Sequence, residues 1–514
     1  MSPETKKQLH LQLWNIARDL RGKMDAVIFK NYILGFIFFK YLSEKMNLFA
    51  DKLLKEDKID YLKIDDSTEN GKELLKVIEE ESKDTLGYFI KPNNLFKSIS
   101  SMPVVSIEQL ENTLNNIEAS TMGTESEDDF GNLFEDLDLH SSQLGKEIET
   151  RQEKITTIMN RLEIIDFEIE NNESDILGDA YEYLIGKFAS DAGKKAGEFY
   201  TPQEVSKVLA RIVTTNKNKL LNVYDPTCGS GSLLLRVGKE VDIVSHFYGQ
   251  ESNPTVYNLA RMNMIMHDIH FNQFDIKEDD TIEEPQHIDL KFEAIVANPP
   301  FSSDWSKNPL FLGDERFSQY GKLPPKDKAD FVFLMHMIHH LDETGVIACI
   351  MPPGVLFRDN AEKHIREFII RDKNYIDSVI GLPENIFFGT TTPTVILVLK
   401  KNRPVENILF IDASNGFDKE GTKNKLRNED VNKIIETYRE RKVENKYSYL
   451  ASKEEIHEND YNLNIPRYID MFEKEKEVDI DEVSVELNEI NASLVENDNS
   501  ISKVCNELNI KPPF

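Results

Sequence analysis

The arrangement of apolar residues in the middle of this chain constrains its fold more than any other feature. Between residues 221 and 401, short apolar runs alternate with segments long enough to form helices. Strands separated by helix-length connections pair in parallel, with helices on the faces of the sheet. The central region is therefore predicted to be a doubly wound α/β domain. Its candidate strands are NVYDP, HFYGQE, NQFDI, EAIVANP, GVIACIMP, IDSVIGLP and TVILVLKK.

The last two of these runs lie close together, on either side of the stretch FFGTTTPTV. A short connection suits antiparallel pairing, because parallel strands need a long crossover. The sheet is thus expected to be mostly parallel, with an antiparallel hairpin at its edge.

The flanking regions divide the chain further, since 514 residues exceed one compact core. Residues 1–165 show helical periodicity and are predicted to form a helical N-terminal domain. Within this domain, the acidic segment 124–145 is interpreted as a mobile loop or linker. Residues 170–412 make up the α/β domain, and residues 413–514 are charged and mainly helical.

The most apolar stretch, YILGFIFFKYL from Tyr32 to Leu42, contains Lys40 and falls short of the ~20 residues that span a bilayer. It is predicted to be a buried helix. No basic region followed by an apolar one is seen at the N-terminus, and the three cysteines lie far apart, as suits a reducing compartment. A cytoplasmic protein without a membrane partner is expected.

The end of the chain carries apolar residues at alternating spacings of three and four, a pattern typical of a helix that pairs with another helix. The alternative is a tail helix that folds onto its own domain. The pattern comprises Leu487, Ile490, Leu494, Ile501, Val504 and Leu508, with Asn497 in the one polar position.

The formal net charge is -30. A protein that grips DNA by itself is expected to present a basic face. Either the ligand is not nucleic acid, or a partner supplies most of the grip. An acidic surface also keeps a protein soluble without any further role.

A glycine-rich turn, YDPTCGSGSLLLR, follows the first predicted strand and leads into a predicted helix. Gly229 and Gly231 allow a tight turn with close backbone approach to a ligand, and Asp225 can accept hydrogen bonds at the strand end. No Lys-Ser/Thr pair follows the glycines, which argues against a phosphate-gripping loop and ATP hydrolysis. A nucleotide-type pocket is predicted, with a plain strand-to-helix turn as the alternative.

Acidic residues follow at the next strand ends. Glu251 comes 26 residues after Asp225, where it suits the two hydroxyls of a ribose. Asp280 or Asp275 could accept from an adenine amino group, although each taken alone is more simply a solvated loop residue.

The stretch AIVANPPF ends a predicted strand on Asn298, two prolines and Phe301. Proline cannot donate to a sheet and biases the preceding residue away from helix, so Asn298 should be held extended at the carboxyl edge. Its side-chain oxygen and the carbonyl of Pro299 can receive both hydrogens of an amino group, which frees the nitrogen lone pair to attack a sulfonium-bound methyl. Phe301 would stack on a flipped base. The alternative is a proline strand terminator with a core phenylalanine.

Three histidines, His336, His339 and His340, lie together in HMIHH. No HExxH glutamate or cysteine accompanies them, and methyl transfer from a sulfonium needs no metal. No metal site is predicted.

In this order, GEFYTP (residues 197–202), DPTCGSGSLL and NPPF resemble the motifs of amino-methylating DNA methyltransferases. The chain is more closely similar to the modification subunit of type I restriction-modification systems. DLRGKMDAVIFKNYILGFIFFKYLSEK, PENIFFGTTTPTVILVLKK and NLNIPRYI extend the similarity over nearly the whole chain. The resemblance implies a Rossmann-like methyltransferase sheet, S-adenosylmethionine as cofactor, and methyl transfer to N6 of a flipped-out adenine in double-stranded DNA.

The resemblance also implies roles for individual residues. The segment that closes over the cofactor matches Gly197, Glu198, Phe199, Tyr200, Thr201 and Pro202. The glycine-rich loop matches Asp225, Pro226, Thr227, Gly229, Ser230, Gly231 and Ser232. Glu251 matches the ribose-binding acid. Asp280 matches the aspartate of Gly-Asp-Thr-Leu, where Asp279 replaces the glycine here. The catalytic Asn-Pro-Pro-aromatic motif matches Asn298, Pro299, Pro300 and Phe301. Phe387 or Phe388 is a candidate second wall of the base pocket, with a core role as the simpler reading.

The family further implies that a separate specificity subunit reads the DNA sequence and joins two modification subunits, with a restriction subunit as a further possible partner. A more basic partner would account for the acidic charge, and the C-terminal region would then serve subunit docking. One rival is methylation of protein glutamine or an RNA base, because related motifs hold other planar amino groups. The other is a catalytically silent scaffold, against which the intact Asp225, Glu251, Asn298 and Phe301 speak.

Overall fold

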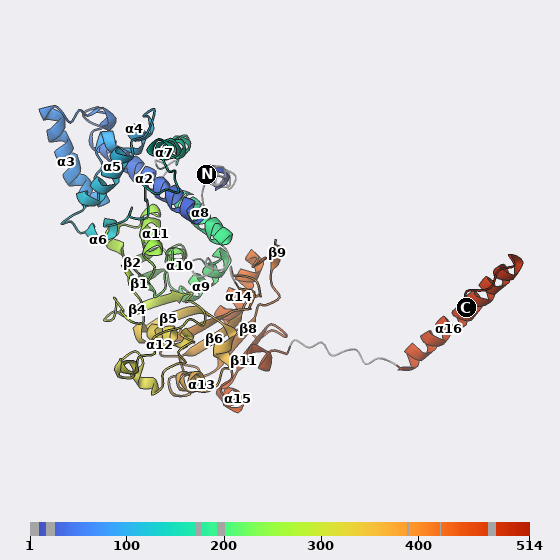
Figure 1. The fold of residues 1–514 in the computed structure, drawn as a ribbon. Helices are drawn as coiled ribbons and strands as arrows, with labels where there is room; N and C mark the ends of the chain where they lie inside the picture. The colour runs from blue at the N-terminus through green and yellow to red at the C-terminus, as the bar shows by residue number, and fades with distance from the viewer. Residues whose placement is uncertain are drawn as a thin grey trace. The chain divides into compact units, whose positions relative to one another are not determined.

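The computed structural model describes residues 10–16, 26–167, 169, 176–192, 201–387, 390–421, 423–470 and 480–514 (Figure 1). Its N-terminal part is helical, as the periodicity predicts. Residues 10–16 are followed by α2 (Ala26–Leu53), α3 (Glu69–Leu86), α4 (Phe96–Ser100), α5 (Ile107–Ser120), α6 (Glu127–Phe130), α7 (Ile148–Glu163) and α8 (Ile176–Ala192).

A nine-stranded sheet follows. All seven predicted strands are confirmed, namely β1 (Lys219–Asp225), β2 (Ile243–Glu251), β3 (Phe274–Glu278), β4 (Phe292–Ala297), β5 (Leu341–Met351), β6 (Ile376–Gly381) and β7 (Val395–Lys400). The sheet also contains β8 (Ile408–Asp412) and β11 (Ser448–Ala451). The short strands β9 (Asp418–Glu420) and β10 (Lys423–Lys425) pair separately. The accompanying helices are α9 (Gln203–Val213), α10 (Ser232–Gly238), α11 (Pro254–Met266), α12 (Asp330–His340), α13 (Ala361–Glu367), α14 (Asn428–Glu440) and α15 (Lys453–Glu458).

The strand order is β11-β8-β6-β7-β5-β4-β1-β2-β3. β3, β2, β1, β4 and β5 are parallel to one another, and β7 is antiparallel to both of its neighbours. The predicted antiparallel hairpin is therefore present as β6 and β7. It lies inside the sheet, because β8 and β11 continue beyond β6.

Both faces of the sheet are covered, as a doubly wound fold requires. In β4, Val296 belongs to one core cluster together with residues of α9, α10 and α14, such as Leu209. Its neighbours Ile295 and Ala297 belong to a second cluster with residues of α12 and α13, such as Met335. Because successive strand residues point to opposite faces, β4 is buried on both sides and its run is almost entirely apolar.

The predicted buried helix is α2, and every residue from Tyr32 to Ser43 is buried. Lys40 sits in this apolar run because it closes the end of α7. Its ammonium donates to the carbonyls of Leu162, Glu163 and Ile165 at 2.9, 3.2 and 2.6 Å. Positive charge at a helix C-terminus is favourable, and the contact also satisfies carbonyls that lack helical partners.

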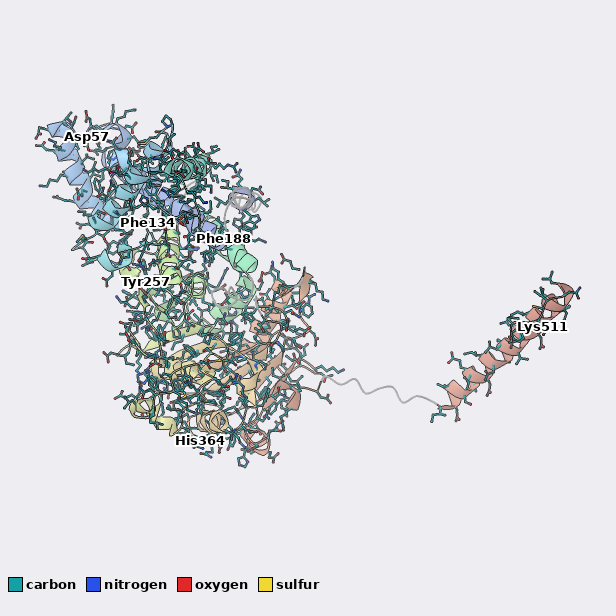
Figure 2. The ribbon with its side chains drawn as sticks, viewed as in Figure 1. Asp57, Phe134, Phe188, Tyr257, His364 and Lys511 are labelled. Carbon is teal, nitrogen blue, oxygen red and sulfur yellow. The ribbon has the colours of Figure 1, made fainter. Side chains whose placement is uncertain are left out.

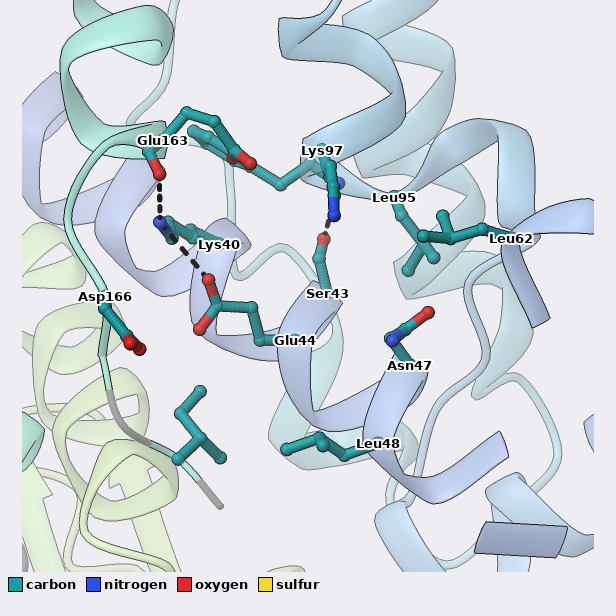
Figure 3. A pocket seen from close by; sticks show the side chains of 12 residues that line it. Lys40, Ser43, Glu44, Asn47, Leu48, Leu62, Leu95, Lys97, Glu163 and Asp166 are labelled. Atoms are coloured by element: carbon teal, nitrogen blue, oxygen red, sulfur yellow. Dashed lines mark hydrogen bonds and ion pairs between the residues drawn. The ribbon is translucent and has the colours of Figure 1, made fainter. Parts of the chain in front are cut away.

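Lys40 also pairs with Glu44 at 3.2 Å, on the wall of a cavity of about 400 Å³ in the helical part (Figure 3). Burial raises the pKa of Glu44 to about 7, against the lowering effect of Lys40. No described helix is long and apolar enough to cross a membrane.

The interpretation of residues 124–145 as a mobile loop or linker is wrong. The segment is folded against the rest of the protein, and its buried apolar side chains are Phe130, Leu133, Phe134, Leu137, Leu139 and Leu144. It also binds α11, where the buried Arg261 donates to the carbonyls of Asp128 and Gly131 at 2.7 and 3.0 Å. Figure 2 labels Phe134 of this segment and Tyr257 of α11, over whose ring the Arg261 guanidinium lies at 4.2 Å. The apolar residues of this segment lie between acidic ones, so its acidic composition does not reveal that it is buried.

The sheet extends beyond the expected domain boundary at Asp412. β11 pairs with β8 in antiparallel register, and α14 and α15 contribute Ile434 and Ile456 to the two core clusters. The first compact unit accordingly ends at Ile469, and a second unit begins at Asp470. In the second unit, α16 (Ile480–Glu507) is a helix with the predicted apolar positions exposed.

Candidate functional site

The turn after β1 is tight, and its backbone lies close to the carboxyl edge of the sheet. Gly229 and Gly231 both have positive φ, +55° and +76°, in the left-handed region that favours glycine. Gly231 precedes α10, and the Cys228 amide donates to the carbonyl of Gln250 in β2 at 3.0 Å. Asn263 of α11 donates to the Ser230 carbonyl at 2.8 Å, while the hydroxyls of Ser230 and Ser232 lie 3.0 Å apart. The turn is therefore held on several sides.

Two carboxylates meet at this turn. Asp225 accepts from the Thr227 amide at 2.9 Å through one oxygen, while the other oxygen is buried without a hydrogen-bond partner among the described residues. Glu251 accepts from the amides of Gly229 and Asn253 at 3.1 and 2.9 Å. Burial raises the pKa of Asp225 to about 8, and the nearby Glu251 adds to the rise. Burial also raises the pKa of Glu251, which its backbone hydrogen bonds oppose.

The loop after β3 packs against the same turn. Asp280 accepts from the amides of Ile282 and Glu283 at 2.8 and 3.2 Å, and the Thr281 hydroxyl donates to the carbonyl of Pro226 at 2.5 Å. Asp275, the other aspartate considered for adenine, instead lies 3.2 Å from the His287 ring. Asp280 is thus the one of the two that lines the cavity described next.

A cavity of about 420 Å³ opens between these elements. It brings together residues from the ends of β1, β2, β3 and β4, the carboxyl edge where open α/β sheets bind ligands. The candidate residues on its wall are Pro226, Thr227, Glu251, Asp280, Asn298 and Pro300. Further wall residues include Trp305, Ala329 and Phe333, which the motifs do not indicate.

Asn298 follows the last residue of β4. Its side-chain oxygen is buried and has no hydrogen-bond partner among the described residues. Such an oxygen costs about 1–3 kcal/mol in a protein interior, so its retention points to a ligand that donates to it. Pro299 is buried, and the half-buried Phe301 meets the buried Phe387 edge-on at 6.1 Å between ring centroids.

The backbone directly after the NPPF motif is fixed by residues that the sequence motifs do not identify. Ser302 has φ +50°, and its amide donates to the buried carboxylate of Asp330 at 2.8 Å. Arg358 donates to the other oxygen of Asp330 at 2.9 Å and also to Glu362 at 2.9 Å. Asp330 is the first residue of α12, which is otherwise almost entirely apolar. An aspartate among core residues is the only sequence signal that could have drawn attention to it.

The three histidines of α12 are packed among aromatic side chains. The His336 ring lies 3.0 Å from the Tyr224 hydroxyl and 3.2 Å from the Arg316 guanidinium, and His340 lies 2.9 Å from the carbonyl of Leu290. Burial holds the pKa of His336 well below its usual range and that of His340 at about 3. Both rings are therefore neutral hydrogen-bonding members of the core.

The remaining candidates are placed as follows. Thr201 is buried. Pro202 directly precedes α9 and lines a different cavity from that of Asn298. Gly197, Glu198, Phe199, Tyr200 and Phe388 lie outside the described residues.

Comparisons with known proteins cover nearly the whole chain. Residues 172–477 match the family model for N-6 DNA methylase, and residues 9–162 match the model for the HsdM N-terminal domain. The type I restriction enzyme MpnII methylase subunit of Mycoplasma pneumoniae is 36% identical over 95% of this chain and 94% of its own length. The MjaVIII methylase subunit of Methanocaldococcus jannaschii is 31% identical over 93% of this chain and 81% of its own.

A solved structure gives the same result. The type I restriction-modification system methyltransferase subunit from Streptococcus thermophilus superposes with a TM-score of 0.82 at 40% identity, over 90% of this chain and all of that one. A structure described under complex assembly and conformational transition of the type I R-M system shares the fold, with a TM-score of 0.62 at 18% identity over 98% of both chains.

Proposed function

This chain belongs to the methylase subunits of type I restriction enzymes, within the N-6 DNA methylase family, and we propose that it methylates N6 of a flipped-out adenine in DNA. The observation that carries the proposal is the buried, unpartnered oxygen of Asn298 at the edge of the cavity. An exocyclic amino group is the donor that suits this acceptor. S-adenosylmethionine, when bound, supplies a methyl group on an electrophilic sulfonium.

The residues divide into two groups in this proposal. When the cofactor is bound, Glu251 would hold its ribose hydroxyls, Asp280 would accept from its adenine amino group, and Asp225 with the Gly229 turn would hold the rest of it. Asn298 and the Pro299 carbonyl accept the two hydrogens of the target amino group, so that its lone pair leaves conjugation with the ring. The amino nitrogen then needs no strong base, because its proton leaves after the new bond has formed. Phe301 stacks on the extruded base, and Phe387 supports the Phe301 ring edge-on.

The partners follow from the same proposal. Residues 1–165 form the helical N-terminal domain, the sheet carries catalysis, and the C-terminal region, above all α16, docks a specificity subunit that reads the DNA sequence. Two copies of this chain share one specificity subunit in the cytoplasm, and a restriction subunit joins them for cleavage. The net charge of -30 supports this division, since a more basic partner would supply the grip on DNA.

The test of this function is a comparison of host genomes with and without the gene, sequenced by a method sensitive to N6-methyladenine. We expect one methylated motif that disappears with the gene, returns with the wild-type gene, and does not return with an Asn298→Ala copy. In a second arm, the purified complex is incubated with tritiated S-adenosylmethionine and DNA, ribosomal RNA or ribosomal protein. Label in RNA or protein, with none in DNA, would favour a methyltransferase that acts on RNA or protein. The absence of label in all three, together with the absence of saturable cofactor binding, would favour the scaffold.

Phe301→Ala should slow methylation without unfolding the protein, because it removes the stacking surface beside the target base. Base stacking on an aromatic ring is worth about 1–3 kcal/mol, which corresponds to roughly 5- to 150-fold in kcat/KM. Steady-state assays on a DNA duplex measure the loss, and Phe301→Tyr, which keeps the ring, is the matched control with near wild-type activity. Equal rates for the alanine variant and the wild type would remove Phe301 from the base pocket.

Cofactor binding should release a proton from Asp225. With a pKa of about 8, Asp225 is mostly protonated at pH 7, and a bound sulfonium and ammonium would favour its charged form. Affinity for S-adenosylmethionine is therefore expected to rise with pH up to about 8. Titration calorimetry at pH 7 in buffers of different ionisation enthalpy counts the protons. A slope indicating release of nearly one proton is expected for the wild type and a much smaller one for Asp225→Asn, whereas identical slopes would exclude Asp225 as the source.

A further inference from the structure

The segment that follows the NPPF motif folds back on itself beside the cavity. Trp305 donates from its backbone amide to the carbonyl of Lys326 at 3.0 Å and from its indole to the carbonyl of Pro325 at 2.8 Å. The Ala329 amide donates to the carbonyl of Ser303 at 3.0 Å. These contacts close residues 303–329 into a loop whose two ends lie together, next to Phe301 at one end and α12 at the other.

Arg316 points from this loop into the protein and is 2% exposed. All five of its N–H donors have acceptors. Nη1 donates to the carbonyl of Thr281 at 3.0 Å and to the His336 ring at 3.2 Å. Nη2 donates to the carbonyl of Ile282 at 2.8 Å, and Nη2 and Nε both reach the carboxylate of Asp314, at 2.7 and 3.1 Å. A guanidinium saturated in this way fixes every group that it touches.

The two carbonyls belong to the residues directly after Asp280. Thr281 and Ile282 lie outside any helix or strand, so Arg316 donates the hydrogen bonds that their carbonyls would otherwise receive within regular structure. From the other side, the Thr281 hydroxyl donates to the carbonyl of Pro226. The Asp280 wall of the cavity is thus clamped between the glycine-rich turn and Arg316.

The clamp continues into β1. His336 is neutral, so the nitrogen facing Arg316 accepts and the other donates to the hydroxyl of Tyr224, which is 3.0 Å away and adjacent in sequence to Asp225. One buried network therefore joins the loop after Phe301, the wall at Asp280 and the strand that ends in Asp225.

We propose that Arg316 is a positioning residue for cofactor binding, which holds the Asp280–Ile282 wall in the shape that receives the adenine of S-adenosylmethionine. The inference rests on the proposed function and deepens it, because it assigns part of the cofactor site to the loop that follows the target-base motif. Arg316 itself does not line the cavity and acts through Thr281 and Ile282.

The test compares Arg316→Lys with Arg371→Lys in the full complex. Lysine keeps the charge but has only three donors on one nitrogen, so it cannot serve both carbonyls, His336 and Asp314 together. We expect the Kd and KM for S-adenosylmethionine to rise on the order of tenfold, which is the effect of losing one charge-assisted hydrogen bond. The kcat at saturating cofactor and the KM for DNA should stay within about twofold of the wild-type values. Arg371, which is 51% exposed and pairs with Glu367 and Asp372, is the control and should change none of these values.

A purely structural role would lower the melting temperature without this division between cofactor KM and kcat. Thr281→Val provides a second variant, since it removes the hydroxyl that holds the same wall to Pro226 and keeps the side-chain volume. If Arg316→Lys does not fold, this variant tests whether the fixed shape of the wall sets cofactor affinity. Unchanged cofactor affinity in a folded variant, or a fall in kcat with cofactor affinity retained, would overturn the assignment. A wild-type complex that neither binds S-adenosylmethionine nor methylates DNA would instead refute the proposed function.

Discussion

Asn298→Ala is expected to nearly abolish methyl transfer while the affinity for S-adenosylmethionine stays close to that of the wild type. In the proposed mechanism the side-chain oxygen accepts a hydrogen of the target amino group, and removing one such preorganised polar group costs roughly 10²- to 10³-fold in kcat or more. In the protein alone this oxygen is buried without a partner among the described residues, so the alanine variant should be as stable as the wild type or more stable.

Three measurements on the same variant check this prediction: single-turnover methylation, cofactor titration and thermal melting. Loss of activity with an unchanged or higher melting temperature identifies a group kept for function at the expense of stability. A large loss of cofactor affinity would place Asn298 in the cofactor site instead, and a lower melting temperature would show that its oxygen has a structural partner. Asn298→Asp serves as a control, since it keeps an oxygen of the same reach but not the neutral amide.

Deletion of residues 483–514 is expected to prevent assembly with the specificity subunit and to leave cofactor binding intact. α16 belongs to a separate compact unit, and Leu487, Ile490 and Leu494 are all more than half exposed. A regular apolar stripe of this kind is typical of a helix that pairs with another helix. Gel filtration of the mixed subunits should show a complex with the full chain and separate peaks with the shortened one.

Point variants make the same test without removing the helix. Ile490→Asp with Leu494→Asp places two charges in the stripe, whereas Asn488→Asp with Asn499→Asp places two on the opposite face of α16. Only the first pair should block assembly. Normal assembly of the shortened chain would refute α16 as the docking element, and equal effects of both pairs would indicate that total charge, not the stripe, governs association.

The parts of the fold that follow from local pattern were predictable. Seven strands were evident because short apolar runs alternate with helix-length segments, and the central ones, such as Ile295 to Ala297, are buried on both faces. β11 was not, since Ser448 to Ala451 is too short for periodicity and exists because the edge of β8 was available to pair. The acidic segment 124–145 was misread because its structure depends on Arg261, which lies more than a hundred residues away in sequence.

The candidate site divides in the same way. Glu251, Asp280 and Asn298 were identified from strand ends, and all three line one cavity because the ends of parallel strands share an edge. The motifs indicated neither Arg316 nor Asp330, although Asp330 stands out as an aspartate in an apolar helix. Both act through hydrogen bonds to the backbone of Ser302, Thr281 and Ile282. Such contacts join loops distant in sequence and leave no spacing to read.

The order of the strands also bears on how this protein is made. Asn298 follows β4, whose neighbours are β1 and β5, and β5 begins only at Leu341. While the ribosome synthesises the intervening residues, β4 is the outermost strand of a partial sheet and its free backbone groups can pair with another nascent chain. The loop that carries Arg316 therefore also lengthens the interval of synthesis during which the strand that leads to Asn298 has an unpaired edge.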